Sequence, residues 1–187
     1  MASTESILAW RRLDSPMGAF LLAHRTDGSL VTDWPDRMGR TWPDDAVRRD
    51  ECLPELAETL ERYFAGDPVD PALSPLALPA GPDFYRRCWT ACRSIPLGST
   101  ASYAELARMA GNQRAVRAAG GGMRHNPIPI LVPCHRVLAS NGGLGGFGGR
   151  TDTNTKAMQL KIQLLDFEAS ITTIHETTNR KDLLQCI

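Results

Sequence analysis

Residues 102–124, SYAELARMAGNQRAVRAAGGGMR, decide the fold of the second half of this chain. The serine that opens this stretch and Glu105 three positions later match a capping box, which predicts a helix over 103–110. A Gly-Asn pair then predicts a turn, and the residues that follow predict a second helix over 113–124. Two short helices joined by a glycine-containing turn are typical of a helix-turn-helix unit.

The second of these helices is almost bare of side chains, because it consists largely of alanine and glycine from Ala115 to Gly122. Glycine in a helix interior costs up to about 1 kcal/mol relative to alanine, so the pattern needs a reason. Tight packing against a neighbouring helix is one explanation. Close approach of another molecular surface is the other, and the pattern alone leaves both open.

The flanking sequence continues the helical pattern. A helix is predicted from Asp83, with apolar residues on one face, to a stop at Ile95-Pro-Leu-Gly98. Residues 126–133 are apolar and proline-rich, which indicates an extended segment, and a glycine-rich loop follows at 141–149. A last helix is expected over about 158–169, and the residues after it show no clear pattern.

The first half of the chain has a different character. Residues 6–33 alternate apolar and polar positions between turn signals, which predicts short strands in a meander. A helix is predicted over 50–64, followed by a linker rich in Pro, Gly and Asp at 65–82. We therefore expect an α+β protein with an N-terminal supporting unit (1–82), a helical second unit (83–169) and a C-terminal tail (170–187).

Composition limits the class of protein. The chain has 187 residues, of which 42% are hydrophobic and 22% charged, a balance normal for a globular protein. No apolar run approaches the length of a membrane helix, and the start lacks the pattern of a signal peptide. The five cysteines are an odd number, which favours reduced thiols over a disulfide framework. We expect a cytoplasmic protein with no membrane partner.

The distribution of charge is informative although the net charge is zero. Residues 1–82 carry eight arginines against fourteen acidic residues, whereas residues 83–137 carry eight arginines against only Asp83 and Glu105. Arginine suits contacts to phosphates and stacked bases, so this basic block favours a nucleic-acid partner. An ordinary solvated helical surface remains the alternative.

Cys134 is the centre of the expected chemistry. A lone cysteine after apolar residues is by default a small core residue. Here His135 supplies an adjacent base and Arg136 an adjacent cation, a setting that activates a thiol as a nucleophile. Prolines before the cysteine stiffen the backbone that carries it.

The pentapeptide Pro133-Cys-His-Arg-Val137 resembles the active-site motif of the O6-alkylguanine-DNA alkyltransferases. The resemblance covers residues 83–169, apart from about seven residues inserted around 150–156. Further similarities lie in the helix before the helix-turn-helix, in the helix-turn-helix itself, in an asparagine hinge and in the closing helix; they comprise Phe84 to Gly98, Ser102-Tyr103, Leu106-Ala107, Asn112, Ala115, Arg117, Gly120-Gly121, Asn126-Pro127, Pro129, Lys161, Leu164-Leu165 and Glu168.

The resemblance implies a fold and a reaction. The first unit would be a small ribonuclease-H-like sheet with a helix, and the second would be winged-helix-like. The protein would move an alkyl group from O6 of guanine irreversibly onto Cys134, without a cofactor, and repair of O4-alkylthymine is left open. His135 would deprotonate the thiol through a water, Glu168 would hold the imidazole tautomer, and Asn126 would brace the backbone.

The resemblance also implies how DNA is bound. A monomer would place the helix-turn-helix in the minor groove of double-stranded DNA, where Ala118 and Gly120 leave room. Tyr103 would press the phosphate beside the target nucleotide, and Arg117 would fill the stack after the base flips out, because a buried thiol cannot reach O6 inside a duplex. Backbone groups of Cys134, Val137 and Gly148 would read the flipped guanine.

Other interpretations are weaker. A non-catalytic lesion sensor of the same family would lack the cysteine, a helix-turn-helix regulator would need base-reading side chains that the bare helix lacks, and a cysteine hydrolase would turn over. The G-x-G-x-x-G match at 143–148 lacks the βαβ frame of a dinucleotide site. Cys88 and Cys92 form at most half a metal site, and Cys52 with His24 does not complete one, so no metal is expected.

Overall fold

The computed structural model describes residues 7–38 and 47–185. The first unit contains a four-stranded sheet in the order β3-β2-β1-β4. Strands β1 (Ile7–Ser15), β2 (Gly18–Arg25) and β3 (Leu30–Asp33) form the expected antiparallel meander, and β4 (Val47–Arg48) adds in parallel to β1. The short helix α1 (Pro35–Met38) follows β3.

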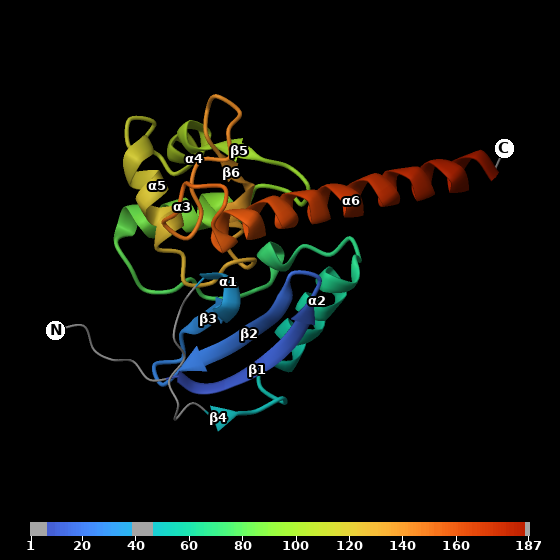
Figure 1. The fold of residues 1–187 in the computed structure, drawn as a ribbon, viewed down its shortest axis with the longest axis horizontal. Helices are drawn as coiled ribbons and strands as arrows, with labels where there is room; N and C mark the ends of the chain where they lie inside the picture. Colours follow the sequence, from blue (N-terminus) through green and yellow to red (C-terminus); the bar gives the residue numbers. More distant parts are fainter. Residues whose placement is uncertain (1–6, 39–46, 186–187) are drawn as a thin grey trace.

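Helix α2 (Pro54–Ala65) packs on this sheet, as Figure 1 shows. Its buried residues Ala57, Leu60, Tyr63 and Phe64 recur at helical spacing, and the helix begins at Pro54, four residues later than the sequence pattern indicated. The helix ends at Gly66, whose φ of 93° is the left-handed conformation that glycine adopts without strain. The linker beyond it contains a short 3-10 helix, η1 (Pro71–Leu73).

The second unit is mainly helical and lies above the sheet in Figure 1. Its elements in chain order are α3 (Asp83–Arg93), β5 (Ala101–Ser102), α4 (Tyr103–Met109), α5 (Val116–Arg124), η2 (Cys134–Arg136), β6 (Val137–Leu138) and α6 (Lys156–Gln185). The capping box of Ser102 and Glu105 is present at the start of α4. The parallel pair β5-β6 was not predicted, because strands of two residues leave no periodic signal.

Helix α5 begins three residues later than the sequence pattern indicated. The Asn112 side chain accepts a hydrogen bond from the Arg114 amide at 3.2 Å, and the Asn112 carbonyl accepts one from the Ala115 amide at 3.0 Å. This local turn satisfies the backbone outside a helix, as asparagine often does. The helix-turn-helix is therefore present with a longer turn.

Tight packing explains two of the glycines of α5. A Cβ atom on Gly121 would lie 2.6 Å from the Tyr85 hydroxyl, and one on Gly122 would lie 3.4 Å from Cβ of Cys88. The Trp89 indole N–H donates to the Gly122 carbonyl at 2.9 Å, which fixes α3 against α5. The bare face at these two positions serves contact between helices.

The residues after Ser170, expected to have no regular structure, continue α6 to Gln185, and Figure 1 shows this end projecting from the body. No glycine or proline interrupts residues 156–185, so nothing in the sequence ends the helix earlier. Its contact with the core ends near Ile171, which is buried, whereas Ile174 is exposed. Within the described ranges, no helix is both long and apolar enough to cross a membrane.

The two units share one hydrophobic core. Thr32 of β3 joins them directly, because its hydroxyl donates to the Pro129 carbonyl at 2.7 Å and its amide donates to the Pro127 carbonyl at 3.2 Å. The extended segment that leads to Cys134 is thus held by the N-terminal sheet. The first unit consequently supports the position of the site in the second.

Candidate functional site

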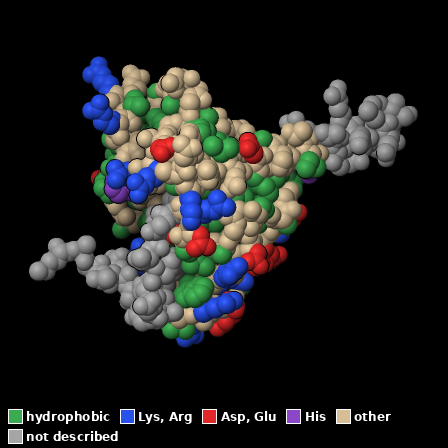
Figure 2. All heavy atoms as spheres, in the orientation of Figure 1, with side chains coloured by type: hydrophobic (Ala, Val, Ile, Leu, Met, Phe, Trp, Pro, Cys, Tyr) green, Lys and Arg blue, Asp and Glu red, His purple; other side chains and the backbone are tan. Residues whose placement is uncertain are grey.

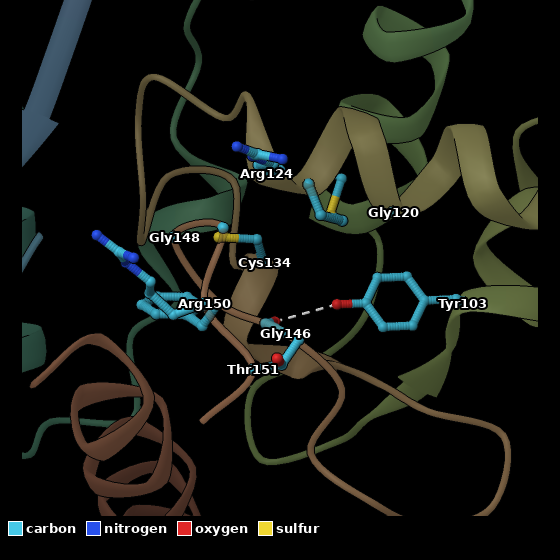
Figure 3. Close-up of a pocket in the computed structure, with 11 residues that line it drawn as sticks. Tyr103, Gly120, Arg124, Cys134, Gly146, Gly148, Arg150 and Thr151 are labelled. Carbon is cyan, nitrogen blue, oxygen red and sulfur yellow. Dashed lines mark hydrogen bonds between the residues drawn. The ribbon is translucent and has the colours of Figure 1, made fainter. Parts of the chain in front are cut away.

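A cavity of about 300 Å³ opens beside Cys134. Its lining comes from four places: Tyr103 of α4; Gly120, Met123 and Arg124 of α5; Cys134 of η2; and residues 146–151 of the glycine-rich loop. Figure 3 shows Cys134 between Arg124 and Gly148, with Tyr103 across the pocket. Among the sequence-predicted residues, Cys134, Tyr103, Gly120 and Gly148 are brought together here.

The Cys134 thiol is held by the asparagine named in the sequence. Cys134 starts the short helix η2 directly after Pro133, and 6% of the residue is exposed. The buried Asn126 amide donates to Cys134 Sγ at 3.2 Å and to the Val132 carbonyl at 2.7 Å. The Asn126 carbonyl oxygen accepts the Ile128 amide at 3.0 Å. Asn126 thus ties the thiol to the backbone segment that precedes it.

His135, which follows Cys134 in η2, forms a buried pair with Glu168. His135 Nε2 lies 2.9 Å from Glu168 Oε1, and both side chains are 1% exposed. Burial alone would raise the pKa of Glu168, but the charges and hydrogen bonds of His135 and Arg136 outweigh it and hold that pKa well below its ordinary value. An ionised carboxylate only accepts, so Nε2 carries the proton in neutral His135.

The other imidazole nitrogen, Nδ1, is therefore the basic one. Nδ1 is buried and makes no hydrogen bond with any described residue. A neutral imidazole with its proton fixed on one nitrogen presents an unprotonated lone pair on the other. The pair can thus take up a proton at Nδ1, and Glu168 stabilises the imidazolium that results.

Arg136 has a different role from the one expected. Its guanidinium donates to both oxygens of Glu168, to both oxygens of Asp70 and to the Ile95 carbonyl, at 2.7–3.0 Å. Two carboxylates therefore neutralise its charge, so it is not the free cation beside the thiol that the sequence indicated. Arg136 instead fixes Glu168 and joins α6 to η1.

Lys161 secures the glycine-rich loop from inside the protein. Its buried ammonium donates to the carbonyls of Val137, Leu144 and Gly146 at 2.6, 2.6 and 3.3 Å. Burial lowers the pKa of Lys161 to about 8, which leaves it protonated at neutral pH with three donors for three acceptors. Val137 is buried and lies outside the cavity lining. Its carbonyl is used by Lys161 in this structure.

Tyr103 packs against the same loop. Its hydroxyl donates to the Gly146 carbonyl at 3.1 Å, as the dashed line in Figure 3 shows. A Cβ atom on Gly145 would lie only 2.7 Å from the Tyr103 ring, and the φ of Gly145 is +69°. This close approach explains Gly145, while Gly146, Gly148 and Gly149 line the cavity.

The remaining predicted residues lie on α5 and its surface. Arg117 and Ala118 are exposed and lie outside the cavity lining, whereas Gly120 lies at the cavity. Six of the eight arginines of the basic block are exposed and form no ion pair with another described residue: Arg86, Arg87, Arg108, Arg114, Arg117 and Arg124. Figure 2 shows blue side chains along the edge of the second unit where α5 lies.

Sequence reasoning missed several residues of the site. Tyr63 and Asp70 reach Glu168 and Arg136 from the first unit, and no local motif marks them. Arg150 and Thr151 line the cavity from the segment that is inserted relative to the family pattern. The resemblance gave no role to residues of this insertion. An unusual length at a loop beside the motif is the one signal that pointed to them.

The other thiols differ from Cys134 in their surroundings. Cys88 and Cys92 are buried on α3, where burial raises the pKa of Cys88 to about 11 and that of Cys92 well above its ordinary value. Both therefore stay protonated at neutral pH. Among the side chains that the structure describes, no group of three or more His, Cys, Asp or Glu residues is placed to hold a metal ion.

Comparisons with known proteins identify the family. The family model "6-O-methylguanine DNA methyltransferase, DNA binding domain" matches residues 83–170. A methylated-DNA–protein-cysteine methyltransferase of Methanosarcina acetivorans is 37% identical, over 80% of this chain and 94% of the relative. One from Bacillus subtilis, described as constitutive, is 33% identical over 83% of this chain and 94% of its own.

Solved structures agree. The crystal structure of Mycobacterium tuberculosis OGT in complex with DNA is similar with a TM-score of 0.69 and 32% identity, over 88% of this chain and 94% of that one. Mycobacterium tuberculosis O6-methylguanine methyltransferase gives a TM-score of 0.63 and 34% identity, over 87% of this chain and 93% of that one. The chain therefore belongs to the O6-methylguanine-DNA methyltransferase family.

Proposed function

We propose that this protein repairs DNA directly, by moving a methyl or other alkyl group from O6 of guanine onto its own Cys134. One observation carries the proposal: the Cys134 thiol lies at the wall of a cavity, held by Asn126 and backed by the His135–Glu168 pair. The relatives that match over most of this chain are named as methyltransferases that act on methylated DNA and a protein cysteine.

The reaction follows from these groups. The thiol proton passes through a water to His135 Nδ1, while Glu168 accepts a hydrogen bond from the protonated Nε2. The thiolate attacks the alkyl carbon, a carbon–sulfur bond forms, and the bond from that carbon to O6 breaks. Its electrons stay with guanine, which takes up the proton that His135 returns. The products are unmodified guanine and a thioether on Cys134, and no cofactor takes part.

Because the product is a thioether on Cys134, each protein molecule acts only once. A thioether is a poor leaving group, and neither His135 nor Glu168 activates a water against its carbon. The protein is therefore consumed with one alkyl group per chain. Steady turnover would favour a cysteine hydrolase instead, and a lesion sensor without chemistry is disfavoured because Cys134 is present at the cavity.

Double-stranded DNA is the proposed partner. The exposed arginines of the second unit suit contacts to phosphates, and the Mycobacterium tuberculosis relative was solved in complex with DNA. We propose that α5 enters the minor groove with Ala118 and Gly120 facing it, and that the target base flips into the cavity. Arg117, exposed on α5, then fills the vacated stack, while Tyr103 displaces the adjacent phosphate.

Backbone groups around the cavity are proposed to read the base. Gly148 and Cys134 already line it, whereas the Val137 carbonyl accepts from Lys161 in this structure and would have to exchange that contact to read the base. The finer fold assignments also stay proposals: a ribonuclease-H-like first unit, a winged-helix-like second unit, and unit boundaries at 82 and 169. A monomer in the cytoplasm is proposed, and the four described cysteines, Cys52, Cys88, Cys92 and Cys134, are free thiols.

The test is transfer of label from a duplex that carries O6-[methyl-³H]methylguanine. We expect wild type and a Cys88→Ser control to take up the label, and Cys134→Ser to take up none while still binding the duplex, since phosphate contacts come from elsewhere. Label on the Cys134→Ser protein would refute the assignment.

A further inference from the structure

Tyr63 reaches the relay from the other unit of the protein. It lies on α2, is fully buried, and donates its hydroxyl proton to Glu168 Oε1 at 2.9 Å across 105 residues of sequence. The same carboxylate oxygen holds His135 Nε2 at 2.9 Å and accepts Arg136 Nη2 at 2.8 Å. Three donors thus share the oxygen on which the imidazole depends.

Packing alone does not require the hydroxyl. The ring of Tyr63 contacts the rings of Phe64 and Phe167 edge-on, with centroids 5.3 and 5.4 Å apart, and neither neighbour carries a polar group. A phenylalanine would fill the same space, whereas a buried hydroxyl costs free energy unless it is hydrogen-bonded. Burial and the negative charge of Glu168 hold the pKa of Tyr63 well above its ordinary value, so it remains a donor at working pH.

We propose that Tyr63 is a positioning residue for alkyl transfer, an inference that rests on the proposed function: its hydroxyl fixes Glu168 and limits how strongly that carboxylate draws the imidazole proton. A carboxylate oxygen that serves three donors offers less charge to each of them. Tyr63 therefore limits how strongly Glu168 stabilises the imidazolium, which keeps the Nδ1 lone pair available to the thiol proton.

The other charged groups around the relay are accounted for. Arg136 faces Glu168 from η2, Asp70 lies behind Arg136, and Lys161 lies on the loop side of α6. None of these contacts involves the Tyr63 hydroxyl. Replacement of Tyr63 by Phe thus removes one donor from Oε1 and leaves these ion pairs and hydrogen bonds in place.

The expected result is a change in the pH dependence of Cys134 reactivity when Tyr63 is replaced. In Tyr63→Phe, His135 and Arg136 receive more of the charge of Oε1, so the imidazolium persists to higher pH. The acid limb of Cys134 reactivity should move upward by about half a pH unit, the scale of one neutral hydrogen bond. Replacement by 3-fluorotyrosine, a stronger donor of the same shape, should move the limb downward. A residue that only fills space would move it in neither case.

The experiment measures Cys134 alkylation by iodoacetamide and methyl transfer from a duplex, each against pH. Tyr85→Phe is the matched control, because its ring stacks on His125 and it makes no hydrogen bond to His135, Arg136 or Glu168. Opposite shifts for the two Tyr63 replacements support the positioning role, and the fluorotyrosine protein decides alone if Tyr63→Phe does not fold. Alkylation profiles that match the control overturn it. Shifted alkylation without methyl transfer in any protein would sustain the inference and reject the proposed function.

Discussion

The Asn126 side-chain amide lies 3.2 Å from Cys134 Sγ, and the same nitrogen lies 2.7 Å from the Val132 carbonyl. One buried donor thus contacts both the thiol and the backbone two residues before it. The carbonyl oxygen of Asn126 is used as well, by the Ile128 amide. The position of the sulfur is therefore set by the segment that connects α5 to η2.

Asn126→Asp tests this contact with a nearly isosteric change. Aspartate keeps the acceptor for Ile128 but loses the donor to sulfur, and it places a negative charge beside a forming thiolate. We expect methyl transfer to slow by about a hundredfold, equivalent to roughly 2.7 kcal/mol for a buried charged contact. Single-turnover rates on a methylated duplex measure it, with Asn112→Asp, at the exposed turn before α5, as the control. Equal rates for Asn126→Asp and wild type would show that the contact is incidental.

Glu168→Gln should change both stability and its dependence on pH. Because the folded-state pKa of Glu168 lies below the ordinary 4.5, its stabilisation is complete above that pH and is lost as the pH falls below it. Loss of the charge leaves Arg136 with Asp70 alone, at a cost of about 3 kcal/mol near pH 7.

Urea unfolding from about pH 7 to about pH 3 measures the difference between wild type and Glu168→Gln. The difference in unfolding free energy should shrink as the pH falls below about 4.5, because the carboxylate of the unfolded chain then takes up a proton while that of the folded protein stays ionised. A constant difference across this range would mean that the charge of Glu168 does not stabilise the fold. Transfer by the variant should also be slower, since the imidazolium loses its charged partner.

Lys161→Met tests the buried cation that holds the loop. With a folded pKa of about 8 against an ordinary 10.5, Lys161 binds fewer protons in the folded state than in the unfolded state between these values. Its contribution to the unfolding free energy therefore rises with pH across that window. Below it, the cost of burying the ammonium is fully present and is offset by its three hydrogen bonds.

We expect Lys161→Met to lose this rise and to transfer methyl groups more slowly, because the carbonyls of Val137 and Leu144 lose the Lys161 donor and the Gly146 carbonyl keeps only the Tyr103 hydroxyl. Urea midpoints at pH 7 and at about pH 10 check the first effect, and single-turnover rates check the second. Lys156→Met, at the exposed start of α6, is the control. If the unfolding free energy of Lys161→Met rises with pH as much as that of wild type, other groups cause this pH dependence.

Local features of the fold could be predicted from the sequence, whereas long-range ones could not. The capping box at Ser102 and the meander of β1 to β3 depend on neighbouring residues. The later start of α5 depends on hydrogen bonds of Asn112, which compete with the helix and leave no periodic trace. The continuation of α6 was missed because its polar sequence lacks a hydrophobic stripe.

The site divides in the same way. Asn126, Cys134 and His135 lie close together in the sequence, within or near the quoted motif. Tyr63 and Asp70 act on Glu168 and Arg136 only because the first unit packs on the second. The sequence shows that Arg136 is cationic, but only the fold shows that it is paired with the carboxylates of Asp70 and Glu168.

Arg117→Ala separates base flipping from chemistry. Extrusion of a base costs a few kcal/mol in a duplex and nothing for a free nucleobase, so only the duplex reaction needs a residue to fill the stack. We expect a loss of about a hundredfold or more on duplex DNA and little loss with free O6-benzylguanine. Second-order rates on both substrates measure this, with Arg12→Ala, at an exposed position of β1 in the first unit, as the control. Equal losses on both would mean that Arg117 supports the fold or the thiol.

The central claim is that Cys134 accepts one alkyl group and keeps it. Intact-protein mass spectrometry with peptide mapping, after incubation with an excess of duplex carrying O6-methylguanine, tests it most directly. We expect the mass of one methyl group on every chain, located on Cys134, with no further lesion consumed after one equivalent. Continued removal of lesions by an unmodified protein, or a methyl group on Cys88, Cys92 or Cys186, would contradict the claim.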